Sequence, residues 1–65
     1  MKITVNGRPE EVSARTLGEY SILNAIESEG ILIVHNGCVM DRNKWANTVL
    51  NDGDSLEILG FVGGG

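Results

Sequence analysis

The sequence ends in three consecutive glycines, Gly63, Gly64 and Gly65, the last of which carries the α-carboxylate. Because glycine has no Cβ, such a tail passes through narrow channels and presents an unhindered carbonyl carbon to an attacking group. Three extended residues span roughly 10 Å, which is enough to carry the carboxylate into the active site of another protein. The chemistry that these residues permit is therefore activation of, and attack on, the Gly65 carboxyl group.

A run typical of a β-strand, Ser55 to Val62, leads directly into the glycines. Chain ends are commonly disordered whatever their role, so a glycine tail alone indicates little. A strand that continues to Val62 adds information, because the folded domain then fixes the point from which the tail leaves. We predict one domain over residues 1–62 and a flexible tail over residues 63–65.

Composition and charge limit the classes of protein to which this chain can belong. A chain of 65 residues, of which 42% are apolar and 22% charged, is typical of a single small soluble domain. The single cysteine excludes an intramolecular disulfide, and the sequence shows no secretory signal or membrane span, so we expect a cytoplasmic protein. A net charge of −4, with the cationic side chains scattered, argues against nucleic acid as a partner.

The first half of the chain predicts a hairpin and then a helix. Met1 to Val5 alternates in polarity, Asn6-Gly7 is a strong hairpin-turn signal, and Arg8 to Val12 forms the returning strand. Thr16 to Glu19 has the spacing of a capping box, which begins a helix that we expect to end at Gly30. Its apolar positions are expected to form one buried stripe: Leu17, Tyr20, Ile22, Leu23, Ala25 and Ile26.

The second half predicts another hairpin and a closing strand. The apolar run Ile31 to Val34, the turn Asn36-Gly37 and the segment Cys38 to Met40 form this hairpin, whose first strand should be the most buried. Asp41 is placed to cap a short helical turn. Asn51 to Asp54 is a tight turn that leads into the last strand.

The resulting order of elements is β, β, α, β, β, β. A single helix between two hairpins buries its apolar stripe most efficiently across one face of a small mixed sheet. The last strand is expected at the centre of this sheet, beside the first strand and parallel to it. This arrangement is an α+β fold of the β-grasp, or ubiquitin-like, type.

Short motifs follow one another along the whole chain: Val5-Asn6-Gly7, Asn36-Gly37, Asp41-Arg42, Trp45, Asp52-Gly53-Asp54 and Gly64-Gly65. Each motif alone is generic, but their order together with the glycine terminus resembles the ThiS family of sulfur carriers in thiamine biosynthesis. The chain departs from the family pattern in its first helical turn, Leu17 to Tyr20, and in the additional glycine Gly63.

The resemblance implies a carrier that is not itself an enzyme. In the family, an ATP-dependent adenylating enzyme of the ubiquitin-activating type (ThiF-like) activates the terminal carboxylate, here that of Gly65. A persulfide sulfur derived from a cysteine desulfurase then converts it to a thiocarboxylate, whose sulfur thiazole synthase (ThiG-like) takes into the thiazole ring. The partner enzymes use the ATP and the persulfide, and the carrier is expected to be a monomer that binds no cofactor, metal or membrane.

Partner enzymes must recognise the folded domain, because glycines offer no side chains. On the last strand, Leu56 and Ile58 are expected to face the helix, which places Leu59 and Phe61 on the opposite face beside the tail. We therefore predict Leu59 and Phe61 as docking residues.

Two residues with reactive side chains are interpreted as structural. Cys38 stands at the start of a strand, where a lone cysteine usually packs or is an incidental thiol. His35 has no cysteine or carboxylate at metal-ligand spacing and no serine placed as a nucleophile, which argues against a metal site or a catalytic triad.

Other functions stay compatible with the sequence. The same tail chemistry serves carriers for molybdopterin, cysteine or methionine synthesis, and a ubiquitin-like domain can also be a protein modifier or an interaction module. The sequence leaves open which sulfur donor loads the tail, whether a covalent link to the adenylating enzyme forms, and whether the native chain extends beyond Gly65.

Overall fold

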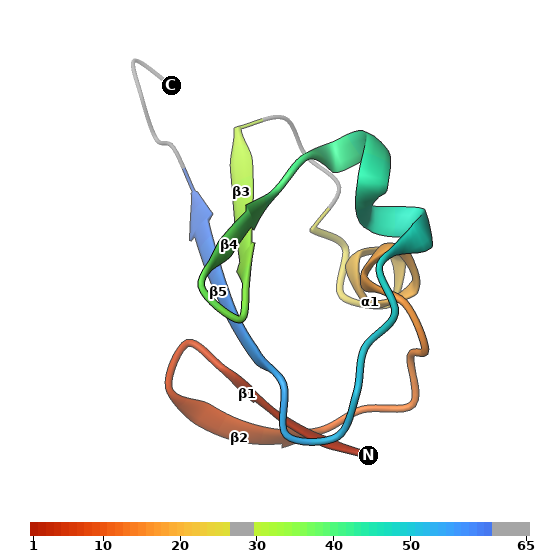
Figure 1. The fold of residues 1–65 in the computed structure, drawn as a ribbon, viewed down its shortest axis with the longest axis vertical. Helices are drawn as coiled ribbons and strands as arrows, with labels where there is room; N and C mark the ends of the chain where they lie inside the picture. The colour runs from red at the N-terminus through yellow and green to blue at the C-terminus, as the bar shows by residue number, and fades with distance from the viewer. Residues whose placement is uncertain (27–29, 61–65) are drawn as a thin grey trace.

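The computed structural model describes residues 1–26 and 30–60, which form a five-stranded mixed sheet with a helix across one face (Figure 1). The strand order is β2-β1-β5-β3-β4, with β5 parallel to β1 and antiparallel to β3. The predicted α+β, β-grasp arrangement is therefore confirmed. The elements are β1 Lys2–Val5, β2 Arg8–Glu11, α1 Leu17–Leu23, β3 Ile31–His35, β4 Cys38–Met40, the 3-10 helix η1 Arg42–Asn47 and β5 Ser55–Gly60.

Both hairpins close through the turns that the sequence predicts. Asn6 and Gly7 have φ angles of 51° and 83°, and Asn36 and Gly37 have φ angles of 49° and 86°. Positive φ at both central positions defines a type I′ turn, which asparagine and glycine adopt more readily than other residues. Pro9 lies in β2 at the sheet edge, where its missing N–H costs little.

Helix α1 begins as predicted but ends earlier. Thr16 Oγ1 accepts a hydrogen bond from the Glu19 N–H at 3.1 Å, and Glu19 Oε1 accepts one from the Arg15 N–H at 2.7 Å. These two bonds confirm the capping box. The expected end at Gly30 is wrong, because Ala25 already takes the left-handed conformation with φ of 55°.

The early end has the hydrogen bonds of a Schellman motif. The Ala25 N–H donates to the Ile22 carbonyl at 3.2 Å, and the Ile26 N–H donates to the Ser21 carbonyl at 2.9 Å. The single buried stripe was wrong for Ala25, which lies beyond the end of α1 and is exposed. It was also wrong for Ile22 and Leu23, which are 63% and 68% exposed. In a helix of two turns, the periodicity places both side chains on the face away from the sheet.

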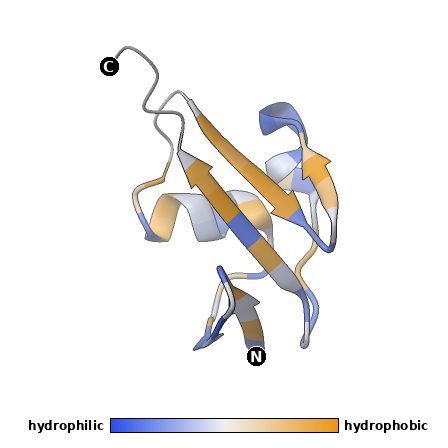
Figure 2. Cartoon of the chain, turned by 90° about the vertical axis from the view of Figure 1, so that its left-hand side faces the viewer, coloured by the Kyte–Doolittle hydropathy of each residue, from blue (hydrophilic) through white to orange (hydrophobic). Residues whose placement is uncertain are grey.

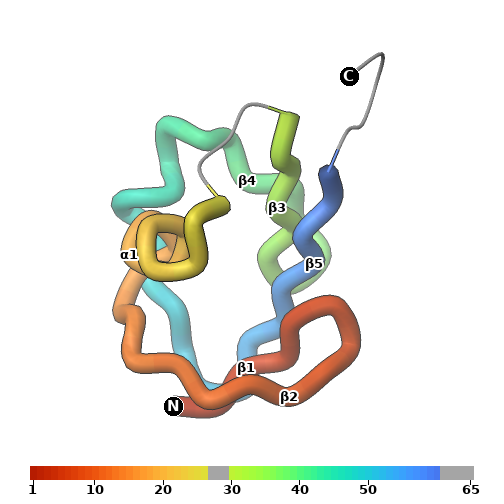
Figure 3. The backbone as a smooth tube through the Cα atoms, turned by 180° about the vertical axis from the view of Figure 1, so that it is seen from behind, coloured from red at the N-terminus to blue at the C-terminus, as the bar shows by residue number. Residues whose placement is uncertain are grey.

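The hydrophobic core lies between the sheet and the layer formed by α1 and η1, which lie side by side (Figures 1 and 3). The buried apolar residues are Ile3, Ala14, Leu17, Tyr20, Ile33, Trp45, Leu50 and Leu56.

Two side chains of the layer formed by α1 and η1 carry polar groups. Asp41 occupies the N-cap position of η1 as predicted, but its side chain makes no capping hydrogen bond. The Tyr20 hydroxyl donates to Glu10 Oε2 at 2.9 Å. Burial of the hydroxyl, and secondly this carboxylate, raise the pKa of Tyr20 to about 12.

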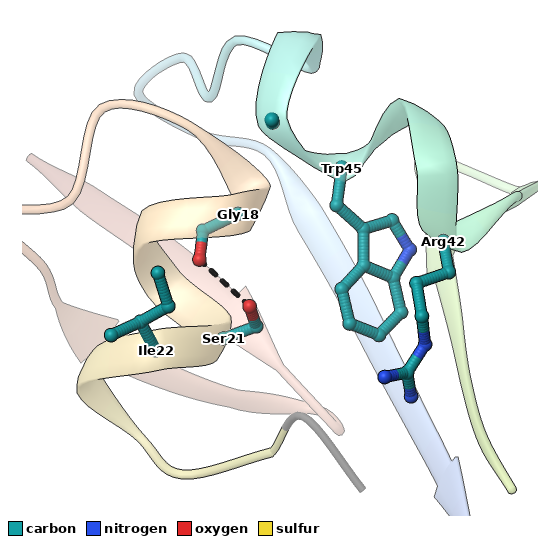
Figure 4. Close-up of a pocket in the computed structure, with 6 residues that line it drawn as sticks. Gly18, Ser21, Ile22, Arg42 and Trp45 are labelled. Carbon is teal, nitrogen blue, oxygen red and sulfur yellow. Dashed lines mark hydrogen bonds between the residues drawn. The ribbon is translucent and has the colours of Figure 1, made fainter. Parts of the chain in front are cut away.

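Gly18 allows α1 to approach η1 closely (Figure 4). A Cβ at this position would lie 2.9 Å from Ala46 Cα and 3.2 Å from Ala46 N, and these backbone atoms have no rotamer by which to move away. Helix propensity alone predicts that Gly18 weakens the first turn by up to about 1 kcal/mol relative to alanine. The contact with Ala46 reverses the sign of that expectation.

We therefore expect Gly18→Ala to lower the free energy of unfolding by about 1–3 kcal/mol, the usual cost of overpacking. Urea denaturation followed by circular dichroism measures this change. Leu23→Ala, at an exposed position of the same helix, is the control and should change stability by less than about 0.5 kcal/mol. A Gly18→Ala variant more stable than the parent would contradict the close packing.

Candidate functional site

Strand β5 occupies the centre of the sheet and leads toward the C-terminus. It pairs with β3 along its length, with Leu56 opposite His35 at one end and Gly60 opposite Ile31 at the other. Antiparallel pairing over this length holds β5 in an extended conformation as far as Gly60, the last residue that the structure describes.

The residues predicted to carry the chemistry follow β5. Gly63, Gly64 and Gly65 lie outside the described residues, as do the predicted docking residue Phe61 and the predicted end of the strand at Val62. Their roles therefore stay predictions. The structure shows instead that β3 supports β5, the strand that precedes these residues.

The two faces of β5 differ as the sequence predicts. Leu56 is fully buried against the core, and Ile58 is partly buried and packs on the same cluster. Leu59 points to the other face and is 46% exposed. In Figure 2 a polar segment of β5 lies between apolar segments of the same strand. The predicted exposure of Leu59 is confirmed.

Leu59 belongs to a larger apolar surface that the sequence analysis missed. It pairs with Leu32 of β3, while Val34 of β3 pairs with Val39 of β4, and alternation places all four side chains on the face away from α1. Val39 is 59% exposed, and Leu32 and Val34 are half-buried. We call these four residues the outer apolar strip. The hairpin register that follows from the Asn36-Gly37 turn is the signal that would have found it.

A polar network anchors the start of β5. His35 Nε2 donates to Asp54 Oδ2 at 2.7 Å, and Asn36 Nδ2 donates to Asp54 Oδ1 at 3.1 Å. The Asn51 N–H also donates to Asp54 Oδ2 at 2.9 Å, and the Ser55 N–H donates to Asn36 Oδ1 at 2.8 Å. The Asp54 carboxylate thus joins the β3–β4 hairpin to the turn before β5.

This network makes stability depend on pH. Burial alone raises the pKa of Asp54, but the hydrogen bonds from His35, the Asn51 N–H and Asn36 together outweigh burial and hold the pKa below its ordinary value of 3.8. A lowered folded-state pKa contributes stability that is present above the unfolded-state value and is lost as the pH falls through the folded-state value.

We therefore expect the free energy of unfolding to fall as the pH is lowered from about 5 toward 2, partly through Asp54. Asp54→Asn should be less stable at pH 6 and should show a shallower pH dependence below pH 4. Asp41→Asn is the matched control, because the Asp41 side chain makes no capping hydrogen bond. Parallel acid profiles for Asp54→Asn and the parent would refute the assignment.

The other candidate side chains form no further site in the described residues. Cys38 is exposed and lies opposite His35 in the β3–β4 hairpin. Within residues 1–26 and 30–60, no three His, Cys, Asp or Glu side chains are grouped closely enough to hold a metal ion. Among the same residues, no helix is long and apolar enough to cross a membrane.

A shallow groove lies on the other side of the molecule from the outer apolar strip. Gly18 and Ser21 of α1 and Trp45 of η1 line it, and the Arg42 guanidinium lies 4.8 Å from the centre of the Trp45 ring (Figure 4). Ser21 Oγ donates to the Gly18 carbonyl at 2.7 Å. The groove belongs to the packing of α1 against η1 rather than to the end of β5.

Known proteins resemble this chain in sequence and in fold. A crystal structure of a thiamine biosynthesis protein (ThiS) from Geobacter metallireducens superposes with a TM-score of 0.82, at 36% identity, with 100% of both chains covered. An NMR structure of a thiamine biosynthesis protein from the same organism gives a TM-score of 0.72, at 35% identity, over 100% of this chain and 88% of that one.

Two curated relatives are longer proteins. Thiazole synthases from Paramagnetospirillum magneticum and Magnetococcus marinus are 33% and 32% identical to this chain over alignments of 70 and 66 positions. The alignments cover 100% of this chain but 20% of each relative, so the chain spans about a fifth of their length.

The profile of the ThiS family matches residues 3–65, nearly the whole chain. The match agrees with the β-grasp topology and with the ThiS structure that superposes over its full length. The chain therefore belongs to the ThiS family.

Proposed function

We propose that this protein carries sulfur as a thiocarboxylate on Gly65 and donates it for formation of the thiazole ring of thiamine. The observation that carries the proposal is the extent of the family match, which continues through Gly65 and so includes the glycine tail. A free α-carboxylate has a pKa of about 3.5 and is therefore an anion and a poor electrophile at neutral pH. The Gly65 carboxylate must be activated before sulfur can replace oxygen.

ATP supplies this activation through a partner enzyme. A Gly65 carboxylate oxygen attacks the α-phosphorus of ATP, pyrophosphate leaves, and the acyl carbon becomes linked to AMP. The terminal sulfur of a persulfide then attacks the acyl carbon and AMP leaves. A thiol then attacks the donor's sulfur and forms a disulfide with it, and the sulfur–sulfur bond to the acyl group breaks. This step releases the thiocarboxylate, whose sulfur is a better nucleophile than the oxygen that it replaced, by analogy with thiolates.

The partners follow from this sequence of steps. An adenylating enzyme of the ThiF type loads the tail, a desulfurase-derived persulfide supplies the sulfur, and thiazole synthase accepts it. The thiazole synthases that contain a segment similar to this whole chain support the last assignment. In this proposal the protein is a co-substrate and its fold has no catalytic role.

Intact mass spectrometry tests the proposal. Incubation with the host's adenylating enzyme, ATP and a persulfide source should give the mass change for replacement of one oxygen by sulfur. Omission of ATP is the control. Conjugates to lysine side chains would instead identify a protein modifier, and transfer of sulfur to a molybdopterin precursor rather than to thiazole would identify a different carrier.

The outer apolar strip is the surface that we propose for docking the adenylating enzyme. Leu59 lies in it next to the last described residue of β5, so an enzyme that receives the tail contacts Leu59. We expect Leu59→Ala to raise the KM for the carrier at least about fivefold, the effect of losing one interface anchor. Pyrophosphate exchange measures this KM.

Val49→Ala is the matched control for Leu59→Ala. Val49 is 59% exposed, and its backbone bridges Thr16 rather than a strand of the sheet. The control should leave the KM unchanged. Equal KM values for both variants would show that the strip is not the docking surface.

A further inference from the structure

One edge of β5 is covered over only part of its length. The parallel register with β1 ends where Val5 lies opposite Leu56, and the turn at Asn6 and Gly7 follows, whereas β5 continues to Gly60. Figures 1 and 3, seen from opposite sides, both show β5 extending past the β1–β2 hairpin, with β3 on one side only. The end of β5 thus has one open edge within the described part of the chain.

The hydrogen bonds identify the backbone groups on this edge. The Leu56 carbonyl accepts from the Asn6 N–H at 2.9 Å, and the Ile58 N–H donates to Asn6 Oδ1 at 2.8 Å. Residues at every second position of β5 therefore direct their backbone groups toward β1. By this alternation the Ile58 carbonyl and the Gly60 N–H also face that side, beyond the last paired residue of β1.

We propose that this edge, the Ile58 carbonyl and the Gly60 N–H, accepts an extended segment of thiazole synthase as an added strand. The inference rests on the proposed function. Addition of a strand to an open sheet edge gives affinity through main-chain hydrogen bonds, which suits a region where glycine offers no side chain to recognise. The added strand also keeps the end of β5 extended toward the acceptor site.

Three features prepare the edge for this role. β3 already holds β5 extended as far as Gly60, so a partner strand does not have to order it. The Asn6 side chain closes the edge at the Ile58 N–H and so fixes where an added strand can begin. Leu59, which is 46% exposed, lies between the two free backbone groups and can pack against the added strand.

The choice of thiazole synthase follows from the relatives. Proteins of that name contain a segment that matches this entire chain, so a domain of this kind and that enzyme are joined in one polypeptide there. A second copy of this chain is the competing occupant. Two such edges would pair through very few backbone groups. The area that they would bury is far smaller than the area that a stable dimer buries.

Gly60→Pro and Gly60→Ala form a matched pair for the test. Both add a Cβ, which would meet Ile31 Cδ1 at an ordinary distance of 3.8 Å, but only proline removes the N–H. Gly60 is not among the residues with positive φ, and by the alternation its N–H faces away from β3, so neither change removes a hydrogen bond between β3 and β5. A third, synthetic chain with glycolic acid at position 60 replaces only the N–H by oxygen.

The dissociation constant for the host's thiazole synthase is measured by calorimetry. Gly60→Ala should bind within about twofold of the parent, the glycolic acid chain about three- to tenfold more weakly, and Gly60→Pro at least about tenfold more weakly. Equal binding by all three would overturn the inference. So would a change in self-association, measured by sedimentation, without a change in enzyme binding.

Thiocarboxylate formation on the same chains separates this inference from the proposed function. If the parent chain forms the thiocarboxylate and the variants bind thiazole synthase equally, only the strand addition is wrong. If the parent chain forms no thiocarboxylate, the proposed function itself fails.

Discussion

Removal of Gly64 and Gly65 is expected to abolish thiocarboxylate formation while leaving the domain folded. Two extended residues span about 7 Å, and a displacement of about 1 Å at a reacting centre already costs on the order of a hundredfold in rate. Loss of at least about a thousandfold is therefore expected in pyrophosphate exchange with the adenylating enzyme. The thermal midpoint should stay unchanged, because the buried core lies between Ile3 and Leu56.

Gly63→Ala is the control for the truncation, because it keeps the length of the tail. Gly63 is additional to the family pattern, so this variant should retain most of the activity. A chain shortened by two residues that still supports pyrophosphate exchange would rule out the carboxylate chemistry. Unchanged binding of the truncated chain to a partner, in the absence of any such chemistry in the parent, would instead identify an interaction module.

Leu56→Ala is expected to lower the free energy of unfolding by about 3–5 kcal/mol, because it removes a fully buried side chain and leaves a cavity. For a domain of this size, total stability is only about 3–10 kcal/mol. The variant should therefore lose at least about a third of its stability and unfold at a much lower temperature than the parent. Its loss of carrier activity would then be a consequence of unfolding rather than of altered docking.

Leu59→Ala is the matched control in the same strand. The same side chain is removed, but Leu59 is 46% exposed, so less than about 1 kcal/mol of stability should be lost. Urea midpoints at equal slope measure both changes. Similar destabilisation by the two substitutions would mean that the two faces of β5 are not assigned correctly.

The hairpins, the capping box and the exposure of Leu59 could be predicted from the sequence because each depends on residues that are close together in the chain. An Asn-Gly pair specifies a type I′ turn by itself, and strand alternation then assigns each side chain to a face. The end of α1 was predicted less well. Gly30 is a strong stop signal, but hydrogen bonds to Ser21 and Ile22 stabilise an earlier end at Ala25.

Local sequence signals were sufficient to predict the order of elements and the β-grasp topology, and they include the glycine tail on which the proposed chemistry depends. Three other features became apparent only in the folded chain: the packing of Gly18 against Ala46, the pairing of His35 with Asp54, and the open edge at Gly60. Each of these depends on segments that are distant in sequence and are brought together by the sheet. Local propensity carries no information about such contacts, because their energies arise only once the strands have paired.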